Sequence, residues 1–329
     1  MNSKKFVQMP GLIILLVVVF ILPLFISGPY ILHVLILTLI NIILASSLRL
    51  INLTGQISLA HSGMLTLGAY TCTLLVMKAG FSSWASLILA AIFAAVVAVL
   101  LGIPYTKLKG IYFSIITILT NEVITLVAQQ WRGMTNGSNG IYNIPRPDPI
   151  VIPGLLTITF DTRTNFYYMV LVIAIISLAI MYAIEHSRVG MTMQGIKQSE
   201  SLSESIGINA TWYKVMAFAL GCFFSGLTGG FYAQYISAID PTTFGFIFAV
   251  YTLIYMVFGG QGKFIGPILG AFILTLLPEL LRPLKEFQPY FFAAVLIIII
   301  FFFPKGLIGL PEWFRGVMNR FTGKREAHA

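Results

Sequence analysis

Long apolar stretches follow one another along almost the whole of this sequence. A helix that crosses the hydrocarbon core of a membrane, about 30 Å thick, needs about 20 predominantly apolar residues. Ten stretches approach or reach that length, at residues 12–27, 31–51, 57–77, 84–104, 111–130, 166–184, 215–237, 246–258, 265–281 and 290–303. Only 9% of the 329 residues are charged, against roughly 25% in a soluble domain. The sequence therefore predicts an all-α integral membrane protein with about ten transmembrane helices, folded as one domain over residues 1–329.

Two of these stretches are irregular, which predicts broken or re-entrant helices. Residues 57–77 are interrupted by Ser58, His61, Ser62, Gly63 and Gly68. The stretch at 246–258 is short and ends in two glycines. Non-helical backbone is tolerated at membrane depth only where it is buried in protein or lines a water-filled cavity.

The distribution of Lys and Arg predicts the orientation of the chain. With ten spans and a cytoplasmic N-terminus, 14 of the 20 Lys and Arg residues lie on the cytoplasmic side, in agreement with the positive-inside rule. Residues 131–165 then form an extracytoplasmic loop, residues 185–213 a cytoplasmic loop and residues 305–329 a cytoplasmic tail. The same rule accounts for the net charge of +9. Because no dense basic run is present, we expect contact with membrane lipid and not with nucleic acid.

The sequence lacks the patterns of a metal site, a nucleotide site or an active site. Its four histidines are isolated from one another, and its two cysteines lie in apolar stretches, as buried thiols commonly do. The glycine-rich residues 259–263 fail the P-loop pattern, because Val257 and Phe264 stand where a glycine and a Ser or Thr are needed. We therefore expect no cofactor, no metal and no enzymatic activity in this chain, and a tight turn at residues 259–263.

The cytoplasmic loop contains the signals of a short capped helix at residues 199–206. Ser199 can cap its N-terminus, and Glu200 would favour the positive end of the helix dipole. Gly207 suits the left-handed position that follows a last helical turn. Its apolar face would be formed by Ile196, Leu202, Ile206 and Ile208. Such a helix could dock a soluble partner, or it could simply lie at the membrane surface.

This loop resembles the coupling loop of LivM-type permeases, the branched-chain amino acid branch of the ATP-driven (ABC) importers. The matching residues are Ile196, Lys197, Glu200, Glu204, Gly207, Ile208 and Asn209. Leu202 and Ser203 stand where small alanines are usual in that family. Further blocks resemble the family in the same order, at residues 54–70 (where Ala60 replaces a usual glycine), 109–113 with 121–122, 135–140, 258–267 and 304–309.

The resemblance implies a permease subunit of the bacterial inner membrane, with the helical bundle of the larger, type II importers. It implies a pore shared with a second, LivH-type permease or with another copy of this chain, two ABC ATPase subunits and an extracytoplasmic substrate-binding protein. The cargo would be branched-chain or other small amino acids, although sister branches carry urea, short amides or aromatic acids. The helix that meets the ATPase would contain Lys197, Glu200, Leu202, Glu204 and Gly207.

Polar residues at membrane depth are candidates for the translocation path. Ionisable groups are costly there, and they usually face a cavity or the protein interior. His61, with Ser58 and Ser62 beside it, could line the path or could hydrogen-bond with backbone that a helix break leaves free. Glu122 could line the path, contact a substrate ammonium group or pair with a neighbouring helix.

The predicted extracytoplasmic loop is rich in Gly and Pro, which predicts turns and short extended segments. Trp131, Asn136, Ser138 and Asn139 are its candidate contacts with a binding protein. The alternative is a turn that has no partner.

Three other classes of protein make different demands on the sequence. A carrier driven by an ion gradient needs acidic or histidine relays in its spans, where only Glu122 and His61 qualify. A passive channel for a small neutral solute would work without ATP and without a docking loop. A membrane enzyme would need a catalytic constellation, and none can be recognised in the sequence.

Overall fold

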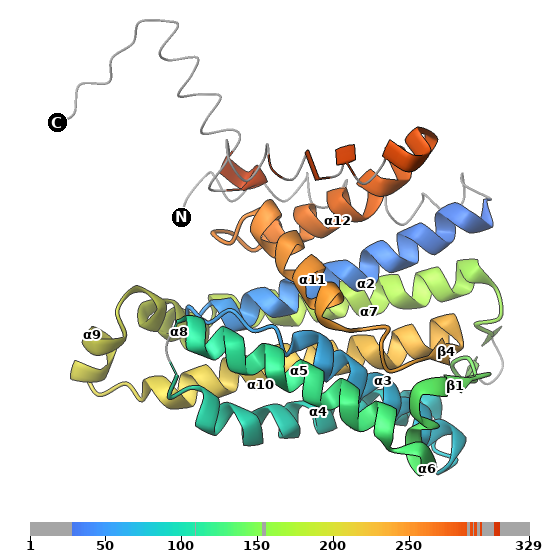
Figure 1. The fold of residues 1–329 in the computed structure, drawn as a ribbon, viewed down its shortest axis with the longest axis horizontal. Coiled ribbons are helices and arrows are strands. Elements are labelled where there is room, and N and C mark those ends of the chain that lie inside the picture. Colours follow the sequence, from blue (N-terminus) through green and yellow to red (C-terminus); the bar gives the residue numbers. More distant parts are fainter. Residues whose placement is uncertain are drawn as a thin grey trace, which may run out of the picture.

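A computed structural model describes residues 28–108, 110–152, 156–287, 290, 291, 293, 294, 297 and 306–309. The predicted span at 12–27 lies outside these residues, as do most of the span at 290–303 and of the tail at 305–329. The described part is predominantly helical, and its long helices lie side by side along the horizontal axis of Figure 1. An all-α membrane architecture is therefore confirmed, while the number of spans in the whole chain stays a prediction.

Eight of the ten predicted spans coincide with helices. Five of these are long and apolar enough to cross a membrane, namely α2 (Pro29–Asn52), α4 (Ser83–Tyr105), α5 (Ile111–Gln130), α7 (Arg163–His186) and α10 (Ala210–Ile236). Three shorter helices coincide with the other spans: α3 (His61–Met77), α11 (Phe246–Gly259) and α12 (Ile265–Leu280). A helix pairs its backbone N–H and C=O groups within its own segment. Spanning segments need this because lipid offers no hydrogen-bond partners.

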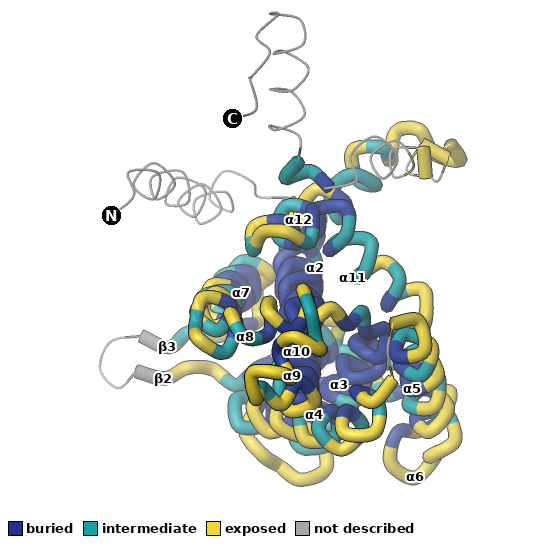
Figure 2. The backbone as a smooth tube through the Cα atoms, turned by 90° about the vertical axis from the view of Figure 1, so that its left-hand side faces the viewer, coloured by how far each residue is buried: buried dark blue, intermediate teal, exposed yellow. Residues whose placement is uncertain are grey.

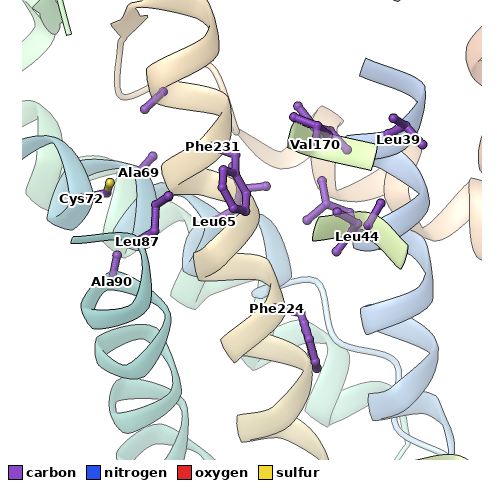
Figure 3. Close-up of a cluster of buried hydrophobic side chains, with 14 of the residues drawn as sticks. Leu39, Leu44, Leu65, Ala69, Cys72, Leu87, Ala90, Val170, Phe224 and Phe231 are labelled. Carbon is purple, nitrogen blue, oxygen red and sulfur yellow. The ribbon is translucent and has the colours of Figure 1, made fainter. Parts of the chain in front are cut away.

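Helices α2, α3 and α10 form the buried centre of the bundle, whereas α4 and α5 present exposed faces (Figure 2). α3 and α10 approach each other through glycines, since a Cβ at Gly68 would overlap the Gly226 carbonyl and one at Gly229 would overlap the Leu65 carbonyl. Small residues permit this close packing, which is a main source of helix association in membranes. Figure 3 shows the apolar side chains of α3, α4 and α10 that fill the space around this contact.

The predicted interruption of residues 57–77 precedes the helix and does not divide it. α3 runs without a break from His61 to Met77. The irregular segment is residues 53–60, which is mostly buried between the end of α2 and the start of α3. Gly68, which contributed to the prediction of a break, serves instead for close contact with α10.

A tight turn joins α11 and α12, as residues 259–263 predict. α11 ends at Gly259, and Gly260 follows with φ of 107°. A Cβ at Gly259 would overlap the Gly266 carbonyl, so the two helices meet directly at the turn, and both pack against α2. The 14 residues of α11 extend about 21 Å, which is less than the hydrocarbon thickness of about 30 Å.

The remaining elements lie at the two ends of the bundle, which we call the α9 end and the α6 end (Figure 1). The α9 end holds α8 (Arg188–Gln198) and α9 (Glu200–Ser205). The α6 end holds α6 (Arg132–Thr135), η1 (Gly137–Asn139), β1 (Ile141–Tyr142) and β4 (Ala238–Ile239). β1 pairs antiparallel with β4, and β2 (Ile150–Ile152) pairs antiparallel with β3 (Leu156–Ile158). Short extended segments were predicted in this loop, and the single helical turn of α6 was not. The short 3₁₀ elements η2 (Arg282–Phe287) and η3 (Leu307–Gly309) follow α12.

Candidate functional site

The loop between α7 and α10 folds into two short helices at the α9 end. The capped helix predicted at 199–206 is confirmed as α9, where the Leu202 backbone N–H donates to the Ser199 hydroxyl at 3.3 Å. Gly207 has φ of 86° after the last turn, as the sequence predicted. The helix before α9, which is α8, was not predicted from the sequence. α8 begins at its own cap, Ser187, whose hydroxyl accepts from the Gly190 N–H at 3.3 Å.

Two large apolar side chains stand exposed on α9 and at its C-cap. Leu202 is 65% exposed and Ile206 is 71% exposed, and Glu204 lies exposed between them. The predicted common apolar face is wrong, because Ile196 belongs to α8 and is buried in the bundle. We call Leu202, Glu204 and Ile206 the α9 tip. Contiguous exposed apolar patches mark interaction surfaces, whereas single exposed apolar side chains are common on any protein.

Two lysines hold these helices against the bundle. Lys197 Nζ on α8 donates to Asn52 Oδ1 on α2 at 2.6 Å. Lys214 Nζ on α10 donates to Glu200 Oε1 on α9 at 2.6 Å. Partial burial, together with the nearby charge of Arg49, lowers the pKa of Lys197. Of the five predicted coupling residues, Lys197 and Glu200 therefore contact the bundle through their charged ends, whereas Leu202, Glu204 and Gly207 are exposed.

A buried ion pair that was not predicted from the sequence joins α2 and α7 at the same end. Arg49 and Glu185 are 4% and 8% exposed, and the Arg49 guanidinium donates to the Glu185 carboxylate. In the sequence, Arg49 was one of the 14 basic residues that indicated the cytoplasmic side. Arg49 and Glu185 each stand at the end of an apolar stretch, and both ends are predicted to lie on the same side of the membrane. This common position was the sequence feature that could have indicated the pair.

The candidate path residues near α3 lie deep in the protein. Ser58, His61 and Ser62 are at most 2% exposed. The His61 imidazole Nε2 lies 2.8 Å from the Ser47 hydroxyl on α2, and the His61 carbonyl accepts from the Ser225 hydroxyl on α10 at 2.6 Å. In this structure His61 therefore connects three helices.

Polar contacts join α5 to the irregular segment 53–60. The Ser114 hydroxyl donates to the Ile57 carbonyl at 2.9 Å, and the Leu59 N–H donates to the Thr117 hydroxyl at 3.1 Å. One turn further, Asn121 is fully buried against Gly63 of α3. We call this contact the α5 seam. Asn121 was not a predicted site residue, although its spacing of four from Thr117 would place both on one helix face.

Glu122 is not brought together with His61. It lies half-buried on α5, while His61 faces α2 and α10. Within the described ranges, the Glu122 carboxylate has no hydrogen bond and no ion pair. The Glu122 carboxylate, next to the α5 seam, is therefore available to accept hydrogen bonds or to pair with a cation.

The predicted binding-protein contacts lie together on a built turn at the α6 end. Trp131, Asn136, Ser138 and Asn139 are all exposed. The buried Thr135 hydroxyl donates to the Ala128 carbonyl at 2.6 Å and fixes the turn to α5. Beside the turn is a hollow of about 500 Å³, whose lining includes Lys78, Arg132, Asn136 and Tyr142.

These features define a multi-pass membrane protein that has a polar seam inside and a different surface at each end. Residues 30–304 match the family of permease components of branched-chain amino acid transport systems, and the chain belongs to that family. It is 28% identical over 290 residues to the high-affinity branched-chain amino acid transport system permease protein LivM of Escherichia coli K12, covering 83% of this chain and 68% of that protein.

More distant relatives carry other names. The chain is 24% identical over 247 residues to the nucleoside ABC transporter permease protein NupC of Lactococcus lactis, covering 69% of this chain and 73% of that protein. It is 24% identical over 254 residues to the ribose import permease protein RbsC of E. coli K12, covering 73% of this chain and 74% of that protein. No solved structure matches the chain.

The family assignment confirms the predicted resemblance. The chain is a transport subunit of an ABC system and not an enzyme, and it is a multi-pass protein of the inner membrane. A permease component acts with ABC ATPases and a substrate-binding protein. The assignment gives no support to a gradient-driven carrier, a passive channel or a membrane enzyme.

Proposed function

We propose that this chain is one of two permease subunits of an ATP-driven importer for branched-chain amino acids. The observation that supports this most strongly is the family match over residues 30–304, together with the similarity to LivM. Other small amino acids, urea, short amides and aromatic acids are alternative cargoes. The companion subunit would be a LivH-type permease, and a second copy of this chain is the alternative.

In this proposal the bundle has ten spans in the type II importer arrangement, with both termini in the cytoplasm. Residues 12–27 and 290–303 supply the first and last spans. The α9 end then faces the cytoplasm and the α6 end faces outward. The excess of Lys and Arg on one side supports this orientation.

The α9 tip would be the contact with an ABC ATPase. Leu202 and Ile206 are exposed where a soluble partner could bury them. The contacts of Lys197 with Asn52 and of Glu200 with Lys214 connect the two short helices to α2 and α10. Movement of the ATPases would therefore reach both long helices, and nucleotide would bias the bundle between two conformations.

The path would open at the α5 seam. α5 is joined to the rest of the bundle there by hydrogen bonds of Ser114 and Thr117. A shift of α5 would uncover Ser58, His61 and Ser62 and would bring Glu122 beside them. Burial of these groups in one state and hydration in the other is the behaviour expected of an alternating-access path.

The extracytoplasmic binding protein would dock on the turn that carries Trp131, Asn136, Ser138 and Asn139. Their common exposure supports this assignment. The hollow beside the turn adds the basic groups of Lys78 and Arg132 to the same surface.

Disulfide crosslinking tests which end of the bundle faces the ATPase and which faces the binding protein. In a variant whose buried Cys72 and Cys222 are replaced by alanine, a cysteine at Glu204 should crosslink to a cysteine in the groove of the ATPase. The matched variant with a cysteine at Asn139 should crosslink to the binding protein and not to the ATPase. Absence of the Glu204 crosslink, together with unaltered transport by Glu204→Pro, would contradict the proposal.

A further inference from the structure

A second hollow at the α6 end lies where α2 and α7 begin and α10 ends. Its volume is about 320 Å³. The residues that matter for its chemistry are His33, Arg146, Phe160, Arg163, Phe166 and Tyr235. None of them is among the residues proposed above for transport or docking.

Two guanidinium groups face this hollow without a carboxylate partner in the described part of the chain. Arg163 Nη1 donates to the Pro29 carbonyl at 2.6 Å, and Arg146 Nη1 donates to the Asp161 carbonyl. Each contact uses one of the five N–H donors of a guanidinium. Both arginines line the same hollow as Tyr235. Arg282, at the same end of the bundle, differs because it pairs with the Glu279 carboxylate at 3.3 Å.

Two like charges at one hollow repel each other, and the repulsion is stronger at a membrane boundary than in bulk water because the effective dielectric constant is lower. An anion between them would remove this cost and would gain charge-assisted hydrogen bonds. Guanidinium groups are well suited to this role, since they bind phosphate and carboxylate groups through two parallel N–H donors.

The wall of the hollow is aromatic. Phe160 and Phe166 are buried, and the Phe166 and Tyr235 rings lie 4.9 Å apart between centroids. His33 stacks on Tyr235 at 5.5 Å, and its Nδ1 lies 2.6 Å from the Tyr235 hydroxyl. The hollow therefore offers an apolar wall beside two cations.

We propose that this hollow binds an anionic group, phosphate or carboxylate, that is attached to an apolar body. Two sources carry this chemistry. One is the headgroup of an anionic phospholipid, which would reach the hollow at the helix ends. The other is the free carboxylate of a small apolar solute.

The test uses the complex of both permeases with the ATPases, purified in detergent without the binding protein, because the binding protein would itself bind leucine. Native mass spectrometry would count bound phosphatidylglycerol, and equilibrium binding of radiolabelled leucine and of inorganic phosphate would test free anions. We expect the double variant Arg146→Gln/Arg163→Gln to weaken binding of one of these probes about tenfold or more, as loss of charged hydrogen bonds implies. The control Arg282→Gln, whose arginine already has a carboxylate partner, should leave binding unchanged.

The pattern of loss identifies the source. Loss of phosphatidylglycerol alone assigns the hollow to lipid, and loss of leucine or inorganic phosphate assigns it to a free anion. Arg146→Lys/Arg163→Lys keeps both positive charges. If this variant retains binding, the loss in the Gln variant comes from the missing charges and not from misfolding. The proposal would be overturned if the folded double variant bound each of the three probes as well as the wild type does. It would also be overturned if the double variant lost only the docking of the binding protein.

Discussion

The two ends of the bundle hold their surface elements by different means. At the α9 end, charged side chains connect α8 and α9 to the long helices, through Lys197 with Asn52 and Lys214 with Glu200. At the α6 end the contacts are mostly to backbone, as in the β1–β4 pairing and the Thr135 hydroxyl bond. The α9 end is therefore suited to transmit a force into the bundle, whereas the α6 end is suited to present a fixed surface.

The largest expected effect concerns the buried ion pair at the α9 end. Arg49→Met leaves Glu185 buried without its partner and should cost about 3–5 kcal/mol of stability. Thermal unfolding of the purified protein would measure this loss. The double variant Arg49→Met/Glu185→Leu should recover most of it, because no charge then remains buried. Arg282→Met at the α6 end, where the arginine is exposed and Glu279 is half-buried, should cost only about 0–1 kcal/mol.

The next effect concerns the α9 tip. Leu202→Ser/Ile206→Ser should weaken binding of the ATPase by about 2 kcal/mol or more, as expected for apolar anchors buried in an interface. Because both side chains are exposed in this chain, its thermal stability should change little. Co-purification of the ATPase measures the first quantity and thermal unfolding the second. Full retention of the ATPase would show that the tip is an ordinary surface helix.

A smaller effect should separate transmission from docking. Asn52→Leu removes the acceptor of Lys197 and should cost about 1.5 kcal/mol, the low end for a hydrogen bond to a charged group, because Lys197 is partly exposed. We expect the ATPase to stay bound while the amount of solute transported per ATP hydrolysed falls. An unchanged ratio in reconstituted vesicles would mean that Lys197 and Asn52 only stabilise the loop.

The smallest effect is expected at the α6 end. Thr135→Val removes the hydroxyl whose single proton is shared between the Ala128 and Trp131 carbonyls, and it should cost about 1 kcal/mol. Stimulation of ATP hydrolysis by the binding protein should decrease, while basal hydrolysis should not. A loss of basal hydrolysis would contradict the division of roles between the two ends.

The sequence predicted the helices well because lipid imposes a simple requirement on any spanning segment. α5 was predicted at its observed bounds, and the Ser199 cap and Gly207 identified α9 from local chemistry alone. Contacts between distant segments could not be predicted in this way. Gly68 was interpreted as a helix interruption, although it serves the approach of α10.

In the candidate site, too, local features could be predicted and contacts between distant residues could not. Exposure of the turn at Asn136 and of Leu202 follows from local sequence, and both lie on the surface. The direction of Lys197 and Glu200 toward the bundle depends on Asn52 and Lys214, which are distant in the sequence. The position of His61 depends likewise on Ser47 and Ser225, and no local pattern indicates such partners.

One measurement tests the central claim most directly. The tagged chain, purified gently from its native membrane with its partners and reconstituted into vesicles, should carry leucine inward only when ATP and the binding protein are both supplied. Mass spectrometry of the same sample should find ABC ATPases and a second permease. A chain that purifies alone and moves solute without ATP would contradict the account.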